Sequence, residues 1–278
     1  TIKATGALDN SGLLLLSDSV TKAGTLNVGT LSNTGAGIIQ SAQDLVINVS
    51  GDTLTNAKTI IAERDLTLTS IGDGMTLTNE NGGFIQSGTT SGDTLTIGGT
   101  AMALNNTGGT ILSDQLAFTL ASLSNAGAIQ GGTAISTIGV SGTLNNAGTL
   151  TLATEGTGNS RVTADTLTNT GTLQSGAGLT ATIIQELNNS GTLFASNNLT
   201  SNSGSLTNSG TFQTNQDATI TTDALTNSGE LITSGTGYNG IINASALTNT
   251  KTGVIQSEID LALNVTDTLD NAGKLLAS

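Results

Sequence analysis

The chain has 278 residues, with 20 acidic and seven basic side chains, no histidine, no cysteine and no proline. The absence of cysteine excludes disulfides, thiol catalysis and thiolate metal sites, and the absence of histidine removes the usual general base and the commonest metal ligand. The formal charge of −13 has the same sign as a phosphate backbone, so we expect no nucleic-acid partner.

A seven-residue phrase, Leu-x-Asn-x-Gly-x-(Leu/Ile), recurs in thirteen near-copies along the chain. The intervals between copies range from 19 to 27 residues. A period near 20 residues indicates a solenoid, in which similar coils stack along one axis. The phrases begin at Leu8, Leu31, Leu54, Leu77, Leu104, Leu123, Leu144, Leu167, Leu187, Leu206, Leu225, Leu247 and Leu269.

Side chains alternate along an extended chain, so the Leu, the Asn and the final apolar residue of each phrase point together into the core. Stacked coils lie about 4.8 Å apart, a spacing at which inward asparagine amides can hydrogen-bond into a ladder. Such a ladder satisfies amides that are otherwise costly to bury. The expected structural ladder consists of Asn10, Asn33, Asn56, Asn79, Asn106, Asn125, Asn146, Asn169, Asn189, Asn208, Asn227, Asn249 and Asn271.

The residues that follow each Asn indicate a turn. Glycine occupies the second position after the Asn in ten phrases, and the exceptions are Lys58, Asn81 and Lys251. Four phrases carry two extra residues before the apolar pair, which predicts a bulge at one corner of the coil. These insertions lie at 35–39, 81–85, 108–112 and 251–255.

The segments between phrases also read as strands, because apolar and polar residues largely alternate at 45–49, 66–69, 218–221 and 261–265. The pattern predicts an all-β fold, a right-handed parallel β-helix of about thirteen coils with two or three strands each. We expect one repeat domain over 1–278, on the order of 60 Å long. Phrases begin and end near the termini without obvious caps, so we expect a piece of a longer chain.

Candidate chemistry is sparse. The closest acidic groupings are Glu258 with Asp260, and Glu63 and Asp65 beside Arg64, and we interpret both as solvated surface rather than acid–base pairs. We therefore predict no catalytic residue, no cofactor and no metal site. The outward hydroxyls of the phrases form a stripe for which two interpretations stand, an ice- or glycan-binding array and the general preference for threonine on exposed strands. The stripe contains Ser32, Thr55, Thr78, Ser124, Thr168, Thr207, Thr226 and Thr248, interrupted at Asp9, Asn105, Asn145, Asn188 and Asp270.

Three phrases in particular, at 123–131, 167–175 and 206–214, resemble the haemagglutinin repeats of two-partner-secretion exoproteins. That family includes filamentous haemagglutinin adhesins and the effectors of contact-dependent growth inhibition. The resemblance implies a β-helical stalk that is exported through a partner outer-membrane transporter and held on the surface of a Gram-negative cell. It supplies no counterpart to the family's secretion domain or to a toxin module.

The leading hypothesis from the sequence is a rigid extracellular stalk that presents adhesive or toxin regions to other cells. A second hypothesis is a module that itself binds a cell-surface receptor or glycan, with specificity in the irregular stretches 71–104 and 131–165. A third is a β-helical enzyme acting on polysaccharides, which would need clustered carboxylates on one face of the rod.

Overall fold

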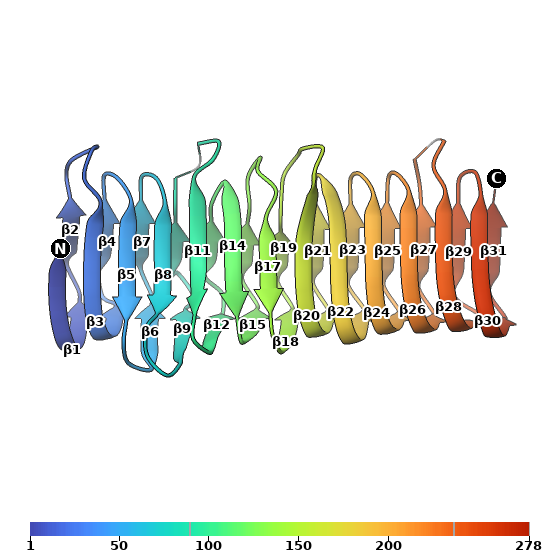
Figure 1. Ribbon diagram of the computed structural model, residues 1–278, viewed down its shortest axis with the longest axis horizontal. Coiled ribbons are helices and arrows are strands. Elements are labelled where there is room, and N and C mark those ends of the chain that lie inside the picture. The colour runs from blue at the N-terminus through green and yellow to red at the C-terminus, as the bar shows by residue number, and fades with distance from the viewer. Residues whose placement is uncertain (89, 236, 278) are drawn as a thin grey trace.

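A computed structural model describes residues 1–88, 90–235 and 237–277, and these residues form a rod of stacked β-strands (Figure 1). The termini lie at opposite ends of the rod. Strands of successive coils pair in parallel, and the described residues contain no helix. Consequently, no described segment has the length and apolar character of a membrane-spanning helix. The predicted all-β parallel β-solenoid of about thirteen coils is confirmed.

One sheet contributes a single short strand to each of the thirteen coils, which we number 1 to 13 in chain order. We call this sheet the short-strand wall. Its strands are β2 (Leu13–Ser17), β4 (Ile38–Ser41), β7 (Thr59–Ala62), β10 (Phe84–Gln86), β13 (Thr110–Leu112), β16 (Ala128–Gln130), β19 (Thr149–Thr151), β21 (Thr172–Ser175), β23 (Thr192–Ala195), β25 (Thr211–Thr214), β27 (Glu230–Thr233), β29 (Val254–Ser257) and β31 (Lys274–Ala277).

The other sheet has 18 strands and forms two walls, a first wall and a ladder wall that carries the Leu-x-Asn residues. In coils 3 to 7 each wall has its own strand. The first-wall strands are β5 (Leu45–Val49), β8 (Leu66–Ser70), β11 (Thr94–Gly99), β14 (Gln115–Leu120) and β17 (Thr137–Val140). The ladder-wall strands are β6 (Thr53–Asn56), β9 (Met75–Asn79), β12 (Met102–Asn106), β15 (Ser122–Asn125) and β18 (Thr143–Asn146).

In the remaining coils one long strand serves both walls. Several of these strands shift register partway along, for example between Ala164 and Thr166, which marks the bend from the first wall to the ladder wall. The long strands are β1 (Ile2–Asn10), β3 (Gly24–Asn33), β20 (Asn159–Asn169), β22 (Gly178–Asn189), β24 (Leu199–Asn208), β26 (Ala218–Asn227), β28 (Gly240–Asn249) and β30 (Leu261–Asn271).

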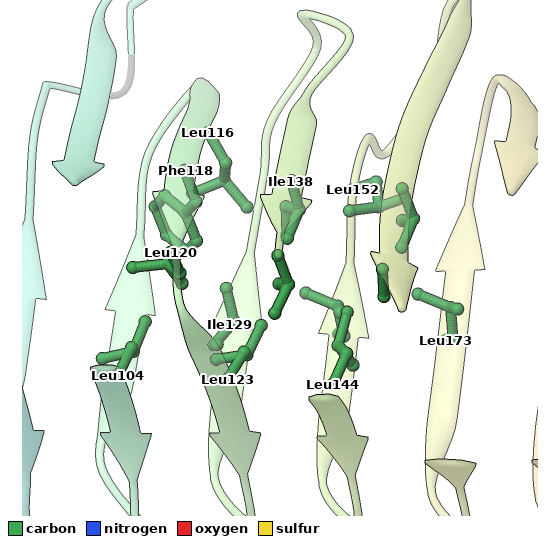
Figure 2. Packing of buried hydrophobic residues seen from close by; sticks show 14 of the residues in the cluster. Leu104, Leu116, Phe118, Leu120, Leu123, Ile129, Ile138, Leu144, Leu152 and Leu173 are labelled. Atoms are coloured by element: carbon green, nitrogen blue, oxygen red, sulfur yellow. The ribbon is translucent and has the colours of Figure 1, made fainter. Parts of the chain in front are cut away.

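The core is made of thin aliphatic stacks that run along the rod. The phrase leucines from Leu31 to Leu247 are at most 2% exposed, and so they form one stack on the ladder wall. Figure 2 shows three of them, Leu104, Leu123 and Leu144, in successive coils. In the last coil Leu269 is 50% exposed, because burial in this fold comes from the coils on either side.

The insertions occupy the corner between the ladder wall and the short-strand wall, as the sequence predicted. In coils 2, 4 and 12 two extra residues form a turn, closed in coil 2 by the Gly37 N–H donating to the Thr34 carbonyl at 2.8 Å. Coil 5 differs from the prediction. Ile111, not Leu112, enters the core and pairs with Ile85. Coil 5 therefore carries one extra residue rather than two. Gly108, with φ +145°, accommodates it.

The glycine pattern also needs correction. The residue that stacks just before each short strand is Gly83 in coil 4 and Gly253 in coil 12, not Asn81 and Lys251, because the insertions shift the chain. Only coil 3, with Lys58, lacks glycine there among the described coils. A Cβ at Gly191, a typical member, would collide with the carbonyl oxygen of Gly171. Close backbone stacking at this corner therefore requires glycine.

Candidate functional site

The structure brings the thirteen phrase asparagines into one continuous column. Eleven of them, from Asn33 to Asn249, are at most 2% exposed, while Asn10 is half-buried and Asn271 exposed. Each Nδ2 donates to the Oδ1 of the asparagine one coil further on, in twelve consecutive hydrogen bonds of 2.7–2.9 Å.

The same amides also tie two walls together. Asn146 Nδ2, for example, donates to the carbonyl oxygen of Thr172 at 2.9 Å, and Thr172 begins the short strand of the next coil. Asn189 does the same with Thr211 at 2.9 Å. The Nδ2 and the Oδ1 of each inner asparagine therefore both have hydrogen-bond partners. This is the condition for burying an amide without a large cost in free energy.

A second group of polar side chains lies on the edge where the short-strand wall turns into the first wall. Asp114 is 2% exposed, and its carboxylate accepts hydrogen bonds from the Gly92 N–H at 2.9 Å and from the Thr133 N–H at 2.7 Å. Burial opposes ionisation, but these bonds and those from the Thr133 hydroxyl and the Ala134 N–H hold the pKa of Asp114 below its usual value. Asp114 thus fastens the turns before β11 and β17.

Neighbouring carboxylates on this edge also accept hydrogen bonds from turn N–H groups. Asp65 Oδ1 accepts from the Thr94 N–H at 2.8 Å, and buried Asp93 accepts from the Thr90 N–H at 3.1 Å. Arg64 lies 3.9 Å from Asp93, with its side chain 62% exposed, so this ion pair is weak. The grouping seen around Glu63 and Arg64 in the sequence is therefore a set of turn contacts.

Sequence reasoning missed Asp93 and Asp114. The available signal was local, since each aspartate stands directly before an alternating strand, where a carboxylate can accept from turn N–H groups. Among the described residues no group of three or more Asp or Glu side chains is arranged to hold a metal ion.

A shallow hollow of about 340 Å³ lies at the opposite corner, where the first wall meets the ladder wall. It draws Gly99 and Ala101 from one irregular stretch of the sequence, and Gly139, Ser141 and Thr163 from the other. Ala101 has φ +45°, and it is the only non-glycine residue with positive φ in the described chain. Strain of this kind is concentrated at binding and catalytic sites. No residue lining the hollow is charged.

The outward hydroxyls form a single row on the ladder wall, in register from coil to coil. Asn105, Asn145 and Asn188 divide the row, so no uninterrupted run of Ser and Thr exceeds three coils. The row therefore lacks the regularity of an extended hydroxyl lattice.

Comparison with known families adds one finding. The family model described as haemagglutinin repeat matches residues 1–18, 156–229, 194–250 and 236–278, together just over half of the chain. No curated protein and no solved structure matches the chain.

Proposed function

The chain belongs to the haemagglutinin-repeat family, and from this membership and the geometry we propose that it is a stiff stalk segment of a secreted bacterial exoprotein. Its role is to hold adhesive or toxin regions away from the exporting cell. The observation that carries the proposal is the unbroken asparagine column, which links every coil to the next inside the rod.

The remaining properties fit export followed by folding outside. The chain has no cysteine, so no disulfide has to form or be broken before passage through a transporter. The proposed partner is an outer-membrane transporter of the two-partner type, and the proposed location is the surface of a Gram-negative cell. Proteins of this family are secreted or cell-surface bacterial proteins of the adhesin type, a non-enzymatic class.

The hollow supports a second candidate, a module that itself binds a receptor or glycan on a target cell. Both irregular stretches of sequence line it, and hydroxyls of Thr119, Ser141 and Thr163 supply hydrogen-bonding groups. Its uncharged lining offers no acid–base pair, which favours binding over polysaccharide cleavage.

Binding of the fluorescently labelled chain to intact bacteria and to epithelial cells, measured by flow cytometry, separates the two candidates. A passive stalk gives no saturable binding to either. A binding module gives saturation that is lost in Gly139→Arg, which fills the hollow. A Cβ at Gly139 lies no closer than 3.5 Å to its neighbours, so the backbone tolerates the change. The matched control is Thr180→Arg, on the first wall outside the hollow.

A further inference from the structure

The outer surface of the short-strand wall carries a row in which glutamine and a non-amide residue alternate coil by coil over the whole rod. We call it the alternating row. Parallel pairing places in register Leu15, Gln40, Ile61, Gln86, Leu112, Gln130, Thr151, Gln174, Phe194, Gln213, Ile232, Gln256 and Leu276. Every even-numbered coil has Gln, and every odd-numbered coil except coil 7 has a large apolar side chain.

The wall that carries this row is unlike the rest of a strongly acidic protein. From β2 to β25, within the described residues, no outward position of these strands holds a charged side chain. The row beside the alternating row adds further apolar side chains, among them Leu13 at 63% and Ile38 at 38% exposure. The hydroxyl row of the ladder wall is also largely uncharged, but it has no such apolar content.

We infer that the short-strand wall is an interface between two copies of this chain, packed face to face and antiparallel. A second copy has the same coil spacing and the same two-coil alternation, so the match in period holds along the full length. Charge also favours this approach, because two rods of charge −13 repel each other least across a face whose outward charges are limited to Glu230 and Lys274 near one end. A glycan lacks a comparable match here, since the wall offers only Phe84 and Phe194 as aromatic platforms.

The two-fold symmetry of such a pair explains the alternation. Suppose that the two-fold axis runs parallel to the strands and passes through one coil. Each even-numbered coil then faces an even-numbered coil of the second copy, and each odd-numbered coil faces an odd-numbered one. Gln therefore meets Gln, and apolar side chains meet apolar side chains. Facing amides can donate to and accept from each other. In the described chain Gln40, Gln86, Gln130 and Gln256 have no side-chain hydrogen bond of their own that would have to be broken. The side-chain amides of Gln174 and Gln213 each donate one bond of 3.0 Å, to the hydroxyls of Thr151 and Ser234, which leaves their Oε1 atoms able to accept.

The area is sufficient for a stable pair. Thirteen strands about 4.8 Å apart and about 12 Å long give about 750 Å² per copy, or about 1,500 Å² in total, within the usual range for specific interfaces. Overlap is greatest with the axis at coil 7, where the residue of the alternating row, Thr151, is only 7% exposed. Gln130 in coil 6 then faces Gln174 of the second copy in coil 8.

Charge substitutions at these two positions test the interface by analytical ultracentrifugation. The unaltered protein is expected to sediment as a dimer of a 27.5 kDa chain. Gln130→Lys with Gln174→Lys sets like charges against each other and raises the dissociation constant at least about tenfold. Gln130→Lys with Gln174→Glu restores the dimer, because opposite charges then meet. The matched control, Ser124→Lys with Thr168→Lys, changes the same two coils on the ladder wall and leaves the dimer intact.

Circular dichroism melting of each variant confirms that the rod is still folded. A spin label at the exposed Gln130→Cys, unique in a chain without cysteine, gives a short distance between the two copies, because the two labels then lie two coils apart across the interface. A label at Thr143→Cys on the ladder wall does not. A monomer at all concentrations, or a dimer insensitive to the double lysine change, overturns the inference. A monomer that binds a neutral polysaccharide, with loss of binding in Gln130→Lys, also overturns it and assigns the wall to that ligand.

Discussion

Coils 3 to 7 and coils 8 to 13 build the same cross-section in two different ways. In coils 8 to 13 one long strand, such as β22 with 12 residues, bends across two walls, and phrases follow at intervals of 19 to 22 residues. In coils 3 to 7 the two walls have separate strands, which are joined by turns such as residues 50–52 and 71–74. The family model matches residues 156–278 and not 19–155.

The comparison shows which part of the coil is fixed. The leucine stack and the asparagine column pass through both regions without a break, with Asn106 and Asn189 making bonds of the same 2.8 Å length. What varies is confined to corners, where a turn can lengthen without disturbing the stack. In the irregular region buried carboxylates hold the turns before β11 and β17, and Asp114 is the clearest case.

The largest expected effect comes from interrupting the column in each region. Asn169, Asn189 and Asn208 changed together to Ala should lower the free energy of unfolding by about 5 kcal/mol, because buried donors and acceptors lose their partners. The same change at Asn56, Asn79 and Asn106 should cost a similar amount. Chemical denaturation measures both. A triple variant with unchanged stability in either region would show that the column is not a source of stability there.

The glycine corner gives the next largest effect. Gly191→Ala should destabilise the rod by about 1–3 kcal/mol, because the new methyl group meets the carbonyl oxygen of Gly171 and the coils must move apart. Lys58→Ala is the matched control, since coil 3 already accommodates a side chain there and Lys58 is exposed. Thermal melting that ranks these two variants equally would contradict the requirement for glycine.

A smaller effect should be confined to the irregular region and should depend on pH. The pKa of Asp114 in the folded rod lies below its unfolded value near 3.8, so the carboxylate stabilises the fold above that pH and loses this contribution as pH falls through the folded pKa. Asp114→Asn should therefore cost about 2 kcal/mol at pH 7, and this cost should decrease as the pH falls below 3.8 toward the folded pKa. Urea midpoints against pH provide the measurement.

The exposed Asp267 supplies the control for that experiment. Asp267→Asn changes the same net charge without removing a turn contact, so its effect should be small at both pH values. A destabilisation by Asp114→Asn that persisted unchanged at pH 2 would exclude ionisation as its cause.

The repeat predicted the coils, the stack and the positions of strands such as β5 and β8, because residue parity in an extended chain decides what points inward. It placed the inward asparagines for the same reason. The alternation of side chains does not reveal how an insertion realigns the chain. The positions of Gly83, Gly253 and Ile111 could therefore be assigned only from the structure. The alternation also does not say which residues of different coils become neighbours. The contacts of Asp114, the hollow and the alternating row depend on how the coils are aligned with one another, which only the structure shows.

The most direct test of the stalk proposal is the distance between two spin labels on the rod. Ser32→Cys and Thr248→Cys place labels in one outward row, ten coils apart, in a chain with no other cysteine. Coils about 4.8 Å apart predict a narrow distance distribution centred near about 48 Å. A broad distribution, or one centred at a clearly shorter distance, would contradict a continuous stiff rod.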